Sequence, residues 1–129
     1  LETGNNNKPG FVTGRVARAG IVNGTVRKVR GAHELSKVKD GDILVAHTTH
    51  PDFVLAMRRA GAIIADEGGN GSHAAQVARE YGIPCVIGAQ SAMEHLEDGI
   101  EAFVDAGKGI IKQNISEVRH ESVKHISSL

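Results

Sequence analysis

The sequence predicts an α/β domain with a central parallel sheet and a small antiparallel element at its N-terminal end. Between residues 42 and 87, short apolar runs alternate with segments of helical periodicity, and the connections are short. Such strand–helix–strand units form right-handed crossovers between parallel strands. Before them, residues 11–30 alternate apolar and polar positions, which is typical of strands. The chain has 129 residues and is 40% hydrophobic, so it is long enough for one domain with a core of its own.

Two short antiparallel strands are expected within residues 11–30. Their apolar positions are Val16, Ile21, Val22, Val26 and Val29. The dipeptide Asn23-Gly24 lies among them, and this pair is a frequent hairpin turn. The preceding residues 1–10 are polar and contain glycine, which indicates a loose tail.

The following segment supplies the parallel sheet. Residues 42–46, 62–65 and 84–87 are apolar runs of strand length. Between the first two runs, the sequence from Pro51 to Gly61 predicts a helix, because proline suits a first helical turn and glycine suits a helix end.

The second helix has both of its ends marked in the sequence. Its apolar stripe at helical spacing comprises Ala74, Val77, Ala78 and Tyr81. Ser72 is a good N-cap, so His73 becomes the first helical residue and lies on the polar side. Gly82 and Pro84 mark the end. We therefore expect a helix over residues 73–81 that packs on its apolar side and leaves His73 exposed.

The C-terminal part predicts one more short helix over residues 91–96 and two strands over residues 100–105 and 110–112. Residues 114–129 carry a few apolar side chains among charges and fit a terminal helix, a linker or a tail. The expected organisation is thus a flexible tail over residues 1–10, one domain over residues 11–113, and this C-terminal segment.

The composition of the chain argues against several classes of protein. Fifteen basic residues balance fifteen acidic ones, which does not favour nucleic acid or an anionic membrane as a partner. No apolar run approaches the roughly 20 residues that span a bilayer. Cys85 is the only cysteine and lies in an apolar run, so we expect a buried structural thiol. With no signal-peptide pattern at the start, we expect a cytoplasmic protein.

The segment from Asp66 to His73 carries the chemistry. Gly68, Gly69 and Gly71 let the backbone come close to a ligand without a Cβ in the way. The helix that follows offers unpaired N–H groups and the positive end of its dipole, which favour a phosphate. A neutral imidazole at that position is a nucleophile. We therefore expect His73 to react with a phosphoryl group, although a histidine that merely begins a helix remains the alternative.

A second loop should border the same site. Residues 47–51 and 66–73 both follow parallel strands, and ligands in open α/β sheets bind outside the C-terminal strand ends. Thr48, Thr49 and Asn70 are therefore candidates for the rim of the site. Plain capping or turn chemistry is the competing explanation for each, and Thr49 fits both roles at once.

Two other kinds of site, a histidine metal site and a serine–histidine catalytic pair, have less support in the sequence. His47, His50 and His73 lie on these loops, but zinc sites need three or more ligands at tight distances, and no cysteine or helical histidine pair supports one. We expect no metal site. Ser72-His73 does not form a serine–histidine pair, because adjacent side chains at a helix start diverge.

The glycine loop resembles that of a known family. Residues 68–75 read Gly-Gly-Asn-Gly-Ser-His-Ala-Ala, and this stretch with residues 77–84 is similar to the phosphohistidine swivelling domain of phosphoenolpyruvate-utilising enzymes. That family includes phosphoenolpyruvate synthase, pyruvate phosphate dikinase, rifampin phosphotransferase and enzyme I of the sugar phosphotransferase system. Residues 38–52, 62–69 and 98–105 also look like the family's strands and loops, so the likeness covers roughly residues 11–113.

The resemblance implies a three-layer β/β/α swivelling domain that forms a phosphohistidine on His73 and shuttles the phosphoryl group between two sites. It implies that Gly68, Gly69, Asn70, Gly71 and Ser72 form the phosphate loop. It also implies an ATP-grasp-type nucleotide-binding partner, a phosphoenolpyruvate/pyruvate barrel partner, or both. Mg²⁺ and ATP or phosphoenolpyruvate would bind there, and no cofactor would bind to this domain itself. The alternative is a binding or regulatory module that only keeps the fold.

One position departs from the family pattern. Relatives usually have threonine two residues before the histidine, and in pyruvate phosphate dikinase this threonine is the target of a regulatory kinase. Gly71 occupies the position here and has no hydroxyl to modify. The early Gly-x-Ser-Pro-Gly segment of many relatives is also altered, to Ala17-Arg18-Ala19-Gly20.

Overall fold

The computed structural model describes residues 7–69 and 72–114. The strands in this part of the chain are β1 (Phe11–Thr13), β2 (Arg15–Arg18), β3 (Ile21–Val29), β4 (Ile43–Ala46), β5 (Ala62–Ala65), β6 (Cys85–Ile87), β7 (Glu101–Asp105) and β8 (Ile110–Lys112). The helices are η1 (Ala32–Lys37), η2 (Pro51–Phe53), α1 (Val54–Arg59), α2 (His73–Tyr81) and α3 (Ala92–His95), of which η1 and η2 are 3₁₀ turns.

The strands form one sheet that folds over into two layers. Their order is β1-β8-β7-β3-β4-β5-β6-β2, and β3 to β6 run parallel. The two halves meet at the long strand β3, which pairs with β7 through its first residues and with β4 through its last. At the other end of each half, β1 and β2 are separated along the chain only by Gly14. The strands between them must therefore fold back on themselves.

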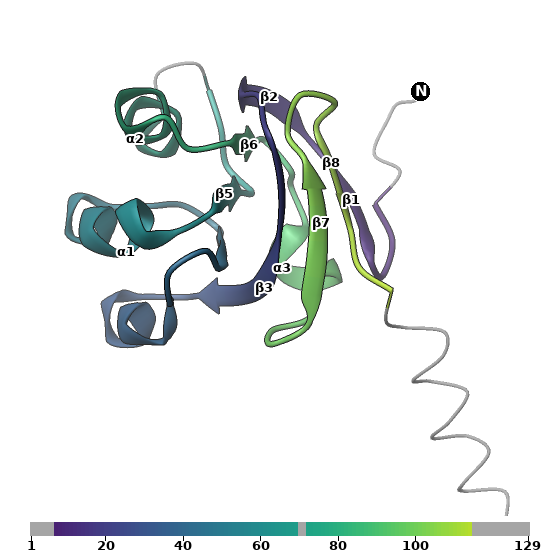
Figure 1. Ribbon diagram of the computed structural model, residues 1–129, viewed down its shortest axis with the longest axis horizontal. Coiled ribbons are helices and arrows are strands. Elements are labelled where there is room, and N and C mark those ends of the chain that lie inside the picture. The colour runs from purple at the N-terminus through teal and green to yellow at the C-terminus, as the bar shows by residue number, and fades with distance from the viewer. Residues whose placement is uncertain (1–6, 70–71, 115–129) are drawn as a thin grey trace, which may run out of the picture.

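The result is a three-layer arrangement. Helices α1 and α2 cover one face of the parallel strands, and β7, β8 and β1 cover the other (Figure 1). This confirms the predicted α/β class with its central parallel sheet. The antiparallel element is larger than expected from the N-terminal residues alone, because it recruits β7 and β8 from the C-terminal part.

Two aliphatic cores separate the three layers. Leu44, Ala46, Ile63 and Ala65 face the helices, whereas Ile43, Val45, Ala62 and Ile64 face the antiparallel layer. Strands β4 and β5 are thus buried on both faces, which explains why their sequences are continuous apolar runs rather than alternating ones. Across the described residues, no helix has the length and apolarity needed to cross a membrane.

The turn expected at Asn23-Gly24 is wrong. Both residues lie inside β3, opposite Phe103 and Ala102 of β7. Glycine is present for a different reason: a Cβ on residue 24 would lie 2.5 Å from the carbonyl oxygen of Gly41. Glycine at position 24 therefore allows two backbone segments to approach closely. Glycine also occurs in strands for this reason, so an Asn-Gly pair alone does not identify a turn.

Several boundaries also differ from the expectation. The helix expected after Pro51 begins with the 3₁₀ turn η2 before α1, and η1 was not expected at all. Tyr81 is 42% exposed rather than buried, and the guanidinium of Arg58 lies 4.9 Å from its ring centroid.

The described part of the N-terminal segment is bonded to the domain. Asn7 donates to Ala89 O at 2.7 Å and accepts from Thr13 N at 2.8 Å, so residues 7–10 are fastened to the domain although they were expected in the tail. The rest of that tail and residues 115–129 lie outside the described residues.

Candidate functional site

Helix α2 begins as its sequence predicts. Ser72 is the N-cap, and its Oγ accepts a hydrogen bond from Ala75 N at 3.2 Å. His73 is the first helical residue, and Gly82 ends the helix in the left-handed conformation at φ 71°. The N–H groups of His73 and Ala74, in the first turn, have no acceptor within the helix. This end of α2 therefore offers an anion both hydrogen-bond donors and the positive end of the helix dipole.

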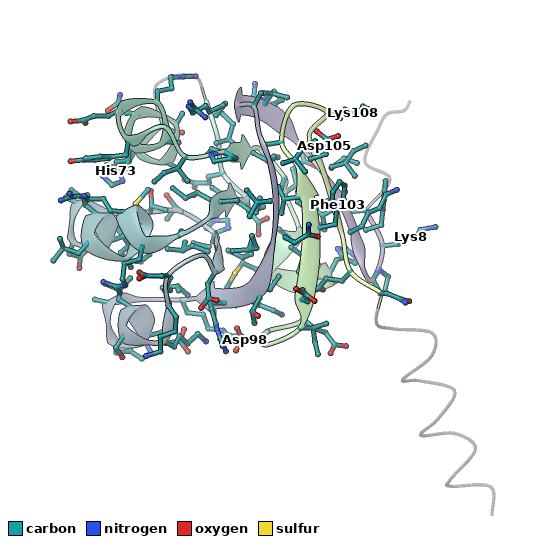
Figure 2. All side chains as sticks on the ribbon, viewed as in Figure 1. Lys8, His73, Asp98, Phe103, Asp105 and Lys108 are labelled. Atoms are coloured by element: carbon teal, nitrogen blue, oxygen red, sulfur yellow. The ribbon has the colours of Figure 1, made fainter. Side chains whose placement is uncertain are left out.

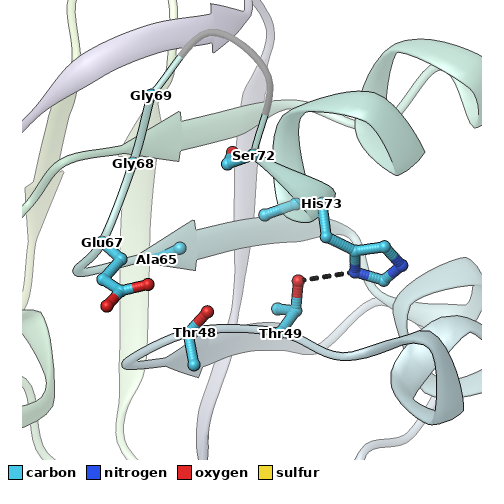
Figure 3. A pocket seen from close by; sticks show the side chains of 9 residues that line it. Thr48, Thr49, Ala65, Glu67, Gly68, Gly69, Ser72 and His73 are labelled. Atoms are coloured by element: carbon cyan, nitrogen blue, oxygen red, sulfur yellow. Dashed lines mark hydrogen bonds between the residues drawn. The ribbon is translucent and has the colours of Figure 1, made fainter.

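The imidazole of His73 is held by one hydroxyl. Thr49 Oγ1 lies 2.9 Å from His73 Nδ1, and the dashed line in Figure 3 marks this bond. Thr49 is only 6% exposed and comes from the loop between β4 and η2, so its own position is fixed by the core. The bond occupies Nδ1 and leaves Nε2 as the ring nitrogen directed away from Thr49. His73 itself is half-buried and projects from the helical layer, on the side opposite Phe103 and Lys108 (Figure 2).

The histidine borders a small cavity at the C-terminal ends of β4 and β5. Its volume is about 250 Å³, and it is lined by Thr48, Thr49, Ala65, Glu67, Gly68, Gly69, Ser72, His73 and Ala74. Among the described residues, no lysine or arginine lines it. Its lining residues with polar side chains are the hydroxyl residues Thr48, Thr49 and Ser72, together with Glu67 and His73. The cavity can thus bind a phosphoryl group through hydrogen bonds, but it supplies no cation to neutralise it.

The glycine loop is fastened to its neighbours by backbone bonds. Glu67 N donates to His47 O at 2.8 Å, Gln90 N donates to Asp66 O at 3.1 Å, and Ser72 N donates to Gly69 O at 3.0 Å. The buried carboxylate of Asp66 accepts from Ala92 N at 2.6 Å and therefore caps α3. Asp66 is accordingly an anchor of the loop rather than a member of the cavity.

The structure brings together most of the residues selected from the sequence. Thr48, Thr49, Gly68, Gly69, Ser72 and His73 all line the one cavity. Asn70 and Gly71 lie outside the described residues. His47 lies at the rim, where its Nε2 is 3.7 Å from a carboxylate oxygen of Glu67. No cluster of three or more potential metal ligands occurs within residues 7–69 and 72–114.

Sequence reasoning missed Arg15 and Glu67. Arg15 Nη2 donates to the carbonyl oxygen of Gly68, from a strand that is remote in sequence. No local sequence pattern predicts a contact between residues this far apart in the chain. Glu67 could have been found, because it directly follows the strand that leads into the glycine loop and precedes Gly68.

Comparison with known proteins points to one family. A family model described as "PEP-utilising enzyme, mobile domain" matches residues 38–109. Phosphoenolpyruvate synthase of Pyrococcus furiosus is 49% identical over 105 residues, which are 81% of this chain and 13% of that protein. Probable phosphoenolpyruvate synthase of Archaeoglobus fulgidus is 44% identical over 118 residues, 92% of this chain and 16% of that protein. The chain therefore spans only a small part of the length of these relatives.

A solved structure agrees with the sequence comparison. The solution structure of enzyme I (nEIt) superposes with a TM-score of 0.53 at 26% identity, over 73% of this chain and 39% of that one. The matched region again includes the greater part of the described domain.

Proposed function

Because the chain belongs to the mobile-domain family of phosphoenolpyruvate-utilising enzymes, we propose that it is the phosphoryl-carrier domain of a phosphotransferase and that His73 carries the phosphoryl group. The observation that supports this most directly is the 2.9 Å bond between Thr49 Oγ1 and His73 Nδ1 at the start of α2. A nucleophilic imidazole needs one nitrogen fixed and the other free. This arrangement supplies both.

In this proposal, each ring nitrogen has its own role. With the proton on Nδ1 donated to Thr49 Oγ1, Nε2 keeps its lone pair and attacks the phosphorus atom. The bond from phosphorus to the leaving group then breaks, and the leaving group takes the electron pair. Positive charge develops on the ring as the Nε2–P bond forms, and the Nδ1–H···Oγ1 bond stabilises that charge. The N-terminus of α2 and the hydroxyls of Thr48 and Ser72 are the donors available to the phosphoryl oxygens.

The cations of the reaction belong to partner modules in this proposal. Phosphoryl transfer relies on positive charge near the transferred group, usually Mg²⁺, lysine or arginine, and no lysine or arginine of the described residues lines the cavity. An ATP-grasp-type nucleotide-binding module, a phosphoenolpyruvate/pyruvate barrel, or both would supply the cations along with ATP or phosphoenolpyruvate. The domain would visit each module in turn and bind no cofactor of its own.

A chemical donor tests the carrier role without any partner. Phosphoramidate phosphorylates imidazoles as its P–N bond breaks and ammonia leaves. We expect the chain to gain one phosphoryl group, detected by mass spectrometry, that is labile in acid and stable in base. His73→Ala should abolish the gain, whereas His50→Ala, a change at an exposed histidine of the neighbouring loop, should not. Full labelling of His73→Ala would contradict the proposal.

A second experiment separates a carrier from a binding or regulatory module. The chain is mixed with ATP and the nucleotide-binding module of the related Pyrococcus furiosus phosphoenolpyruvate synthase, or with phosphoenolpyruvate and its barrel module. Phosphorylation of His73 by either mixture supports a carrier. Stable association without phosphorylation, together with no reaction with phosphoramidate, would support the module that only keeps the fold.

A further inference from the structure

Arg15 reaches the glycine loop from the edge of the sheet. It begins β2, which is the last strand in the sheet order, and it lies opposite Ile87 of β6. This register places its guanidinium beside the ends of β5 and β6, where the loop leaves the sheet. Arg15 Nη2 donates to the carbonyl oxygen of Gly68, a partner 53 residues away.

Gly68 is also packed against the end of β6. A Cβ on residue 68 would lie 2.5 Å from Gly88 N and 2.6 Å from Ile87 Cβ, so no side chain fits there. Arg15 also lies against Gly88, since a Cβ on residue 88 would be 3.2 Å from Arg15 Nε. The peptide of Gly68 is therefore packed on β6 while its carbonyl group is bonded to the guanidinium of Arg15.

A short series of contacts connects Gly68 to the histidine. Gly68 and Gly69 form part of the wall of the His73 cavity. The carbonyl oxygen of Gly69 accepts from Ser72 N at 3.0 Å, and Ser72 Oγ accepts from Ala75 N at 3.2 Å. The position of Gly68 thus affects both the cavity wall and the cap that begins α2.

We propose that Arg15 is a positioning residue for phosphorylation of His73, an inference that rests on the proposed carrier function. Glycines lose more conformational freedom than other residues when they are fixed, so a loop rich in them needs external contacts to keep one geometry. A planar guanidinium suits this role, because its rigid fork loses little freedom for each hydrogen bond it makes. Arg15 itself is exposed, so its contact contributes little to the stability of the whole domain.

The test compares two arginines of the same strand. Arg15→Gln removes the contact with Gly68. Arg18→Gln is the matched control, because Arg18 is equally an exposed arginine of β2 but lies beside Gly82, at the other end of α2. Phosphorylation by phosphoramidate is followed by mass spectrometry, and amide hydrogen exchange is measured over residues 66–75. Thermal unfolding of each variant shows whether the fold is intact.

We expect Arg15→Gln to slow phosphorylation of His73 by about five- to twentyfold, a size typical of lost preorganisation. Hydrogen exchange at residues 66–75 should become faster, and Tm should change by less than about 2 °C. Arg15→Lys, which keeps the charge without the fork, should restore only part of the rate. Arg18→Gln should leave the rate and the exchange of the loop as they are.

Two results would overturn this role. Unchanged exchange at residues 66–75 in Arg15→Gln would show that Arg15 does not fix the loop. Equal slowing by Arg18→Gln would show a general charge effect. Failure of the carrier function itself is distinct, since the unchanged chain would then not be phosphorylated on His73 at all, while the exchange measurement would still report on Arg15.

Discussion

At the scale of single residues, the site relies on small side chains. The ring of His73 is oriented by the hydroxyl of Thr49, and the cavity beside it is lined by further hydroxyls and by glycine backbone. Hydroxyls and glycines leave the ring approachable, which is what the proposed carrier role requires. Among the described residues, the orientation of the ring then depends on a single side-chain hydrogen bond.

Replacing Thr49 tests that dependence. Thr49→Val keeps the shape of the side chain but removes the hydroxyl that accepts from Nδ1–H in our proposal, and a hydrogen bond of this kind contributes about 1 kcal/mol. We expect phosphorylation of His73 by phosphoramidate to slow by about fivefold, the rate equivalent of that energy. Thr49→Ser keeps the hydroxyl and should retain most of the rate. Nitrogen NMR of the imidazole would show the Nδ1–H tautomer depleted in Thr49→Val, and an unchanged tautomer would contradict the assigned role.

Cys85 shows how completely the core encloses the residues beneath the site. Its thiol lies 4.0 Å from Ala74 O, below the first turn of α2. Burial raises the pKa of Cys85 to about 12, with a smaller opposing effect from Arg79. This agrees with the buried structural thiol expected from the sequence and excludes a thiolate nucleophile at neutral pH.

At the scale of elements, helix α2 is the part that local sequence determined best. Ser72 and Gly82 both act as caps, because capping is decided by a few neighbouring residues. Features that depend on distant residues were predicted poorly. Gly24 makes room for the carbonyl of Gly41, and Arg15 reaches Gly68 from another strand. Nothing near residue 24 or residue 15 distinguishes these uses from a turn glycine or a solvated arginine.

The C-cap of α2 gives a stability prediction. Gly82 has φ +71°, and a Cβ there would meet nothing closer than 3.6 Å, so Gly82→Ala adds backbone strain without a clash. We expect a loss of about 1 kcal/mol in the free energy of unfolding, measured by urea denaturation. Gly107→Ala is the control, because residue 107 has no positive φ and a Cβ there would make only ordinary contacts at 3.5 Å. Equal losses in both variants would show that the left-handed conformation is not the cause.

The loop before β7 gives a prediction about acid. Burial alone would raise the pKa of Asp98, but hydrogen bonds from Lys28 N at 2.7 Å and Lys37 Nζ at 3.2 Å outweigh it, so the pKa lies below its usual range. A carboxyl with a lowered folded-state pKa adds stability above its unfolded pKa of about 3.9, and this stability is lost as the pH falls through the folded value.

In Asp98→Asn, the free energy of unfolding should therefore depend less on pH under acidic conditions. We expect the unchanged protein to lose more free energy of unfolding between pH 6 and pH 3 than Asp98→Asn does, as measured by urea denaturation at both pH values. Asp40→Asn serves as the control, since Asp40 is exposed and has no hydrogen bond or ion pair among the described residues. A loss in Asp98→Asn as large as that of the unchanged protein would rule out the role of the carboxylate.

At the scale of the whole molecule, the half-buried His73 on a single domain fits the proposed carrier role better than a complete active site. Each transfer needs a site that excludes water around the phosphoryl group, whereas His73 projects from the outer side of the helical layer. The relatives are several times longer, since the chain spans 13% of the Pyrococcus furiosus protein. The remaining length of those proteins is where we propose the donor and acceptor sites to lie.

The chain alone should therefore show no turnover. We expect no net conversion of ATP, phosphoenolpyruvate or pyruvate by the purified chain, measured by phosphorus NMR over many hours. Addition of a matching donor module should restore phosphorylation of His73, and linking the two should raise its rate through a roughly millimolar effective concentration. Sustained conversion by the pure chain that His73→Ala abolishes would show that this domain holds a complete active site.

The segment from Phe11 to Arg18 has a consequence for biosynthesis. Its first half pairs with β8, where Phe11 lies opposite Lys112, and its second half pairs with β6, where Arg15 lies opposite Ile87. A growing chain on the ribosome makes this segment before either of its partners. Helix α2 and the parallel strands can begin to assemble earlier, and β6 can pair with β2 once residue 87 has left the ribosome. The antiparallel side stays open longer, because β3 lacks β7 and β1 lacks β8 until residue 112 has emerged. Until then, the edges of the half-built sheet are exposed to other chains. The period of greatest risk for aggregation thus ends with the emergence of the last strand, β8.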